Sequence, residues 1–166
     1  MKIFPQKNYT YKSKYTKTEV LDFLKNNIEK EKPFAVSLTG PNYTKPYIGQ
    51  ILFNKFDIKR VIKYRNSFLP QITGEVIDEG TGSTIEVKMD LNMLIKVFIG
   101  LWLGIVGLVC IGATAAIILT TIKLNIAMIA PYFMFLFGFF LVKLPFNFEC
   151  KRSTTDLAMI LKATIN

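Results

Sequence analysis

Two long runs without a charged residue lie in the second half of the chain, and they constrain every fold that it can adopt. The first run covers residues 97–122, the second covers 124–142, and only Lys123 separates them. A helix needs roughly 20 consecutive apolar residues to cross the hydrocarbon core of a bilayer. At a rise of 1.5 Å per residue, the two runs reach about 39 and about 28 Å. They therefore predict a hairpin of two transmembrane helices, with spans at 97–121 and 125–143.

A pair of buried helices in a soluble protein is the alternative to this hairpin. A helix in a soluble protein is rarely apolar on every side over such a length. A cleavable signal peptide does not explain the runs, since such peptides lie at the N-terminus, where residues 1–15 are polar and rich in lysine. The membrane hairpin is the interpretation that the pattern favours.

The distribution of cations predicts the orientation of the hairpin. Sixteen of the 21 Lys and Arg residues precede the first span, and four follow the second. Cytoplasmic segments next to a membrane carry an excess of Lys and Arg. We therefore expect both termini in the cytoplasm and the turn at Lys123 and Asn125 outside. The abundance of Lys, Ile and Asn is typical of AT-rich genomes, which favours a bacterial inner membrane.

Shorter patterns on both sides of the hairpin predict a small mixed domain. Thr16 and Glu19 have the spacing of a capping box, and Pro33 ends the apolar periodicity that follows, so residues 17–30 are expected to form an amphipathic helix. Period-two alternation predicts the strands. Strands are expected at 34–38, 47–53, 56–63, 71–77, 84–89 and 145–151, a last helix at 154–163, and an edge strand or a flexible arm over 1–15.

These elements define the predicted fold class, an α+β membrane protein. A small antiparallel β-sheet or barrel with flanking helices would carry the two-helix hairpin as an insertion between neighbouring strands. Closing the sheet into a barrel would remove its exposed edges. The predicted boundaries are 1–90 for the first part of the cytoplasmic domain, 91–144 for the hairpin, and 145–166 for a final strand and helix that complete the domain.

Small residues lie on one face of the first span, at Gly100, Gly104, Gly107 and Ala115. Such residues let two helix backbones approach closely in lipid. The face predicts close packing, either against the second span or against another copy of the chain in a homo-oligomer. Neither span contains a charged residue, which argues against ion-coupled transport by one chain.

A group of cations and hydrogen-bond donors precedes the strand expected at 71–77. Guanidinium, amide and hydroxyl groups together suit phosphate or another anion. The alternative is a solvated basic face near anionic lipid headgroups, attracted by about 1 kcal/mol per cation. The candidate ligand-binding residues are Lys59, Arg60, Lys63, Arg65, Asn66 and Ser67.

Signals for catalysis and for metal binding are poor. The chain contains no His, which excludes Ser-His and Cys-His pairs. Its two cysteines, Cys110 and Cys150, are too few for a zinc site. The sequence Gly80-Thr81-Gly82 is a turn with no helix after it, unlike a nucleotide fingerprint. We therefore predict no enzyme, no metal and no cofactor. Nucleic acid is not an expected partner, because positive charge beside a membrane needs no further explanation.

The predicted architecture resembles the membrane effectors of bacterial cyclic-nucleotide antiphage defence, in which a two-helix hairpin is joined to a small cytoplasmic β-barrel. The resemblance implies a barrel that binds a cyclic nucleotide, and chains that then oligomerise and breach the inner membrane. The β domain followed by a helix at 154–163 also resembles bacterial pleckstrin-homology-like membrane proteins.

These observations lead to one expected function and one alternative. We expect a membrane-anchored sensor or effector whose β domain binds an anionic ligand, such as a nucleotide, and controls the packing or oligomerisation of the hairpin. The alternative is a non-catalytic anchor that docks a protein partner or anionic lipid headgroups.

Overall fold

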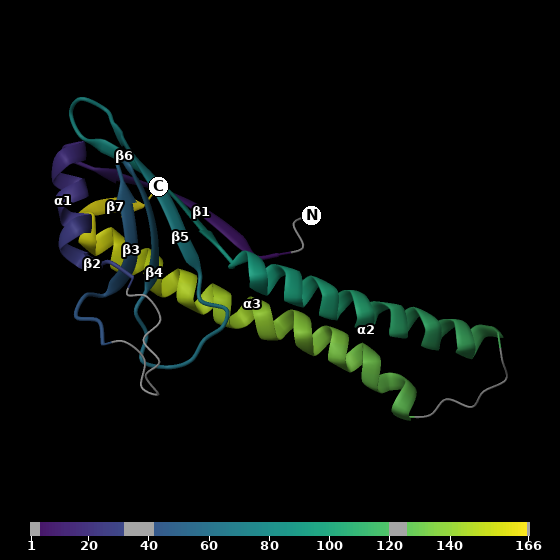
Figure 1. Cartoon of the computed structure of the whole chain (residues 1–166). Helices are drawn as coiled ribbons and strands as arrows, with labels where there is room; N and C mark the ends of the chain where they lie inside the picture. The colour runs from purple at the N-terminus through teal and green to yellow at the C-terminus, as the bar shows by residue number, and fades with distance from the viewer. Residues whose placement is uncertain (1–3, 32–41, 120–125, 166) are drawn as a thin grey trace.

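The computed structural model describes residues 4–31, 42–119 and 126–165, which form one mixed sheet and three helices (Figure 1). The α+β class expected from the sequence is confirmed. In chain order the elements are β1 Gln6–Ser13, α1 Lys17–Asn27, β2 Ile28–Glu29, β3 Tyr47–Leu52, β4 Lys55–Arg60, β5 Gln71–Asp78, β6 Ser83–Asp90, α2 Met93–Leu119, α3 Ile126–Ile160 and β7 Ala163–Ile165.

The seven described strands form an open sheet in the order β2-β3-β4-β5-β6-β1-β7. Neighbouring strands are antiparallel, except that β2 runs parallel to β3. The N-terminal strand β1 is not an edge strand, because it pairs with β6 on one side and with β7 on the other. The hairpin therefore connects β6 to β7, which lie two places apart in the sheet rather than side by side. The strand expected at 34–38 lies outside the described residues.

Capping fixes the start of α1 as the sequence predicts. The Glu19 backbone N–H donates to Thr16 Oγ1, and the Thr16 backbone N–H donates to the Glu19 carboxylate at 2.9 Å, which completes a capping box. Val20, Leu21 and Leu24 are buried on one side of the helix. The helix ends at Asn27, three residues before the predicted end, because Ile28 already has extended backbone and pairs with Tyr47 of β3.

The prediction of a strand at 145–151 is wrong, because a single helix, α3, runs from Ile126 to Ile160 through this segment. Phe146 is fully buried whereas Phe148 is 55% exposed, so the two aromatic side chains lie on different faces. Pro145 costs the helix a backbone hydrogen bond but does not end it. The buried positions recur at helical spacing, at Phe146, Cys150, Ser153, Leu157 and Leu161.

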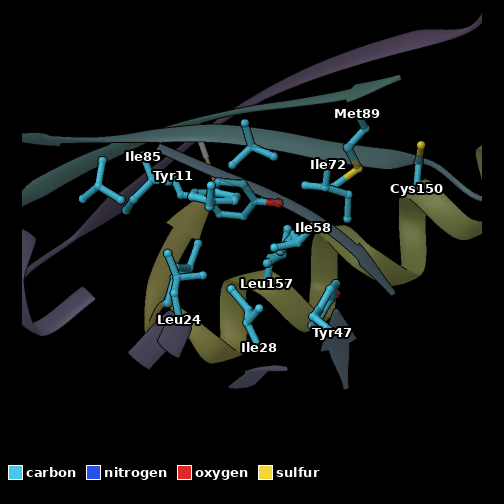
Figure 2. Packing of buried hydrophobic residues seen from close by; sticks show 14 of the residues in the cluster. Tyr11, Leu24, Ile28, Tyr47, Ile58, Ile72, Ile85, Met89, Cys150 and Leu157 are labelled. Carbon is cyan, nitrogen blue, oxygen red and sulfur yellow. The ribbon is translucent and has the colours of Figure 1, made fainter. Parts of the chain in front are cut away.

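The hydrophobic core lies between one face of the sheet, α1 and the C-terminal half of α3 (Figure 2). Tyr11, Ile58 and Ile85 reach this core from three different strands, and Leu24 and Leu157 enter it from the two helices. The alternation predicted for β6 is confirmed at Ile85, Val87 and Met89, which are all buried. The end of α3 and α1 therefore cover this face of the sheet together.

The other half of α3 lies beside α2, and the two helices project away from the sheet (Figure 1). Both are long and apolar enough to cross a membrane. Large apolar side chains are exposed on both helices, such as Leu119 of α2 at 81% and Phe133 of α3 at 68%. The end of the first predicted span, at residue 121, and the connection at Lys123 and Asn125 lie outside the described residues.

Candidate functional site

Three of the predicted ligand-binding residues line a hollow between the β4–β5 connection and α3. The hollow has a volume of about 630 Å³. Arg65, Asn66 and Ser67 line it from the connection at residues 61–70, together with Tyr64 and Phe68. Helix α3 supplies the opposite wall with Pro145, Phe148, Glu149 and Arg152.

The donors of this hollow suit an anion. Arg65 and Arg152 are exposed, and neither forms an ion pair with another residue in the described part of the chain. The guanidinium carbon of Arg152 lies 4.4 Å from the centroid of the Phe148 ring, which holds the charge beside an apolar floor. Asn66 Oδ1 accepts from the Phe68 backbone N–H at 2.9 Å, which leaves its amide group free to donate.

The other three predicted residues do not line the hollow. Lys59 projects from the outer face of the sheet, where its ammonium lies 3.6 Å from the Glu31 carboxylate. Lys63 is exposed in the connection. Arg60 points to the opposite face from Lys59, toward α3. These three residues therefore have different environments: Lys59 lies on the outer face of the sheet, Lys63 lies in the connection, and Arg60 forms an ion pair with α3.

Arg60 joins β4 to two carboxylates of α3. Its Nε atom lies 2.9 Å from Asp156 Oδ2, and its Nη1 atom lies 3.5 Å from Glu149 Oε2. The side chain of Glu149 is only 1% exposed, so its charge depends on these neighbours. The two carboxylates are seven residues apart, or about two helical turns, and therefore lie on the same face of α3.

Tyr64 connects this ion-pair cluster to the hollow. Its hydroxyl donates a hydrogen bond to the Glu149 carboxylate. This bond, with a contribution from burial, raises the pKa of Tyr64. Arg152 is also close to the Tyr64 hydroxyl. A polar network thus runs from Arg152 at the hollow, through Tyr64 and Glu149, to Arg60 on the sheet.

Sequence reasoning missed Glu149, Asp156 and Arg152 as site residues because it placed Glu149 on a strand and Asp156 on a separate helix, with Arg152 between the two. Their spacing carries the signal once the segment is taken as helix, since 149, 152 and 156 recur at three and four residues. Arg60 supplied a second signal, because a cation among the apolar positions of a strand requires a partner from another element.

A second hollow, of about 620 Å³, lies on the face of the sheet away from α3. Its lining includes charges of both signs, and Lys55 lies 3.6 Å from the Glu75 carboxylate. Asp57 accepts two hydrogen bonds from the Gln71 amide. These internal pairs make the second hollow less suited to an anion than the one at Arg65.

The predicted helix-packing glycines have three different environments. A side chain at Gly107 would contact Phe135 of α3, so this glycine faces the partner helix. One at Gly100 would contact Phe4 of the N-terminal segment, and one at Gly104 would meet open space. The tightest approach is at Gly138, which the sequence did not single out, because a methyl group there would overlap the ring of Trp102. Ala115 is half-buried on α2.

Within the described residues, no group of three or more His, Cys, Asp or Glu side chains is placed to hold a metal ion. No family model, curated protein or solved structure matches the chain. The functional argument therefore depends on the geometry of the hollow and of α3.

Proposed function

We propose that the protein is a membrane-anchored sensor or effector. Helix α2 and the first half of α3 form a hairpin in the bilayer, and the α+β domain binds an anionic ligand on the cytoplasmic side. Ligand binding at the hollow controls the packing or self-association of the hairpin. The observation that carries the proposal is the continuity of α3, which belongs to the hairpin at one end and to the domain core at the other.

The membrane part of the proposal is supported by the surface of the hairpin. Leu101, Leu108 and Phe133 are each more than 60% exposed, a costly arrangement in water over two whole helices. Lys151 and Arg152 lie on α3 just beyond its apolar surface, where the domain begins. Cations beside a membrane are more frequent on the cytoplasmic side, which supports a cytoplasmic domain.

The coupling part is supported by the position of the hollow on α3. At 1.5 Å per residue the 35-residue helix is about 52 Å long. The residues that line the hollow, from Pro145 to Arg152, lie at the junction between its two halves. A ligand that draws Arg152 toward Arg65 would act on the same rigid element that packs against α2. Helix shifts of this kind are a common form of switching.

Binding to the detergent-solubilised full chain tests the ligand. We would titrate the protein with inorganic phosphate, AMP and cyclic AMP by isothermal calorimetry. Loss of one charge-assisted hydrogen bond in Arg65→Ala or Arg152→Ala should weaken binding about tenfold or more. Lys63→Ala is the matched control, since Lys63 is exposed in the same connection but does not line the hollow. Absence of binding, or equal affinity in all three variants, would reject the site.

A second candidate function is a non-catalytic anchor that docks a protein or lipid headgroups. It is favoured by exposed Leu144 and Phe148, which extend the apolar surface of the hairpin to the edge of the hollow. Replacement of the hairpin by an unrelated two-helix anchor distinguishes the two functions. An anchor tolerates the exchange, whereas a sensor that acts through α3 loses its response.

A further inference from the structure

A narrow apolar slot lies where the N-terminal segment meets the end of the hairpin nearer the sheet. Its volume is about 90 Å³. It differs from the hollow at Arg65 in position and in chemistry, since six of its seven lining residues are apolar. Three parts of the chain form it: Phe4 and Pro5, Ile99 and Leu103 of α2, and Phe139 and Val142 of α3.

Gly100 has no side chain, which leaves space for Phe4 of the N-terminal segment to form one wall of the slot. A Cβ atom at this position would lie 3.5 Å from the end of the Phe4 ring, so a larger side chain would displace Phe4. Phe4 also packs against the hydrophobic core, and Ile99 and Val142 are buried. The walls of the slot are therefore held by both the domain and the hairpin.

Lys143 is the one charged residue that lines the slot. Its ammonium nitrogen lies 5.3 Å from the centroid of the Phe139 ring, and no carboxylate among the described residues pairs with it. Lys96, at the corresponding end of α2, is already bound to Asp90 at 2.7 Å. Lys143 is thus available to an anion from outside the chain.

We propose that the slot binds an acyl chain of an anionic phospholipid whose phosphate pairs with Lys143. The inference rests on the membrane insertion proposed above. Hydrocarbon matches the apolar lining, and a compact ammonium suits a phosphate oxygen. Lys143, which lines the slot, is itself exposed, so a lipid beside the hairpin can reach its ammonium group.

Trp102 is the single tryptophan of the chain and lies two residues after Gly100 on α2. Its fluorescence therefore reports on lipid at this position. We would reconstitute the full chain in phosphatidylcholine vesicles that contain a minor fraction of brominated phosphatidylglycerol. A second set would contain the same fraction of brominated phosphatidylcholine. Bromine on a neighbouring lipid quenches the fluorescence of the indole. One lysine near lipid phosphate contributes about 1 kcal/mol, which predicts about a fivefold preference of the slot for the anionic lipid.

Three variants assign this preference to the slot. Lys143→Glu should abolish it, and Leu103→Phe should lower it by filling the slot without changing charge. Lys151→Glu is the matched control, because Lys151 is exposed on the same helix and does not line the slot. An unchanged emission maximum of Trp102 shows that the hairpin of each variant is folded.

Vesicle flotation separates this proposal from the one on which it rests. A chain that does not float with the vesicles would overturn membrane insertion and the lipid site together. Normal flotation with equal quenching by the two brominated lipids would overturn the lipid site alone, as would equal effects of Lys143→Glu and Lys151→Glu.

Discussion

Arg60 of β4 and Asp156 of α3 form the ion pair that joins the sheet to the helix, with 2.9 Å between Nε and Oδ2. The same guanidinium reaches Glu149, two helical turns nearer the hairpin. Arg60 therefore holds α3 at two points, two helical turns apart, rather than at one. Arg60, a predicted ligand-binding residue, thus contacts the helix that forms one wall of the hollow.

Removal of Arg60 should destabilise the domain. Arg60→Ala leaves the Glu149 carboxylate buried without its cation, which costs about 3–5 kcal/mol when one partner of a buried pair is lost. Lys59→Ala removes only an exposed ion pair on the other face and should change the free energy of unfolding by less than about 0.5 kcal/mol. Denaturant unfolding in detergent measures both, and similar losses would contradict the role given to Arg60.

The C-terminal half of α3 should behave as core and not as an exposed helix. Leu157 is fully buried, so Leu157→Ala should cost about 2–5 kcal/mol of unfolding free energy through lost burial and a cavity. Met159→Ala, two residues further on, truncates a side chain that is 66% exposed and should cost little. If thermal unfolding shows equal effects, α3 does not pack on the sheet as described.

Close packing of the hairpin should depend on Gly138 more than on Gly104. Gly138→Ala places a methyl group into the ring of Trp102, which must move or separate the helices. Gly104→Ala meets open space within the chain. Trp102 fluorescence should therefore shift in the first variant and not in the second. A shift caused only by Gly104→Ala would instead place a second chain against that face.

Acid should weaken the junction between β6 and α2. Burial by itself would raise the pKa of Asp90, but the Lys96 ammonium and the Leu91 backbone N–H lower it below its ordinary value. Because the folded state favours the ionised form, this stabilisation is complete above the unfolded pKa of about 3.9 and is lost as the pH falls through the folded pKa.

Asp90→Asn tests this dependence. Its unfolding free energy should fall less steeply below about pH 4 than that of the unchanged protein. Asp22→Asn removes a carboxylate from an exposed pair with Lys25 and should leave the pH profile nearly unchanged. An identical acid profile in Asp90→Asn would show that the Lys96 contact contributes nothing.

Local patterns in the sequence predicted most of the elements. The capping box at Thr16 and the alternation through Ile85 gave α1 and β6 at nearly the observed positions. Each of these patterns involves only residues that are close together in the sequence. The parallel pairing of Ile28 with Tyr47 was not predictable in this way, because it depends on residues far apart in the chain.

The error at 145–151 has a specific physical cause. Pro145 is normally a helix-breaking residue, and Phe146 and Phe148 alternate as in a strand, so the local signals favoured an extended segment. Packing of Phe146, Cys150 and Leu157 against the sheet outweighs the hydrogen bond lost at Pro145. The same error concealed Glu149 and Arg152, and with them one wall of the hollow.

Accessibility of single cysteines in intact cells tests the membrane hairpin most directly. In a Cys110→Ser background the remaining native Cys150 is buried, so new cysteines at Asn125→Cys and Met159→Cys report the two ends. The proposal predicts that a membrane-impermeant maleimide labels position 125 from outside and position 159 only after permeabilisation. Labelling of position 159 in intact cells, or recovery of the protein in the soluble fraction without detergent, would contradict it.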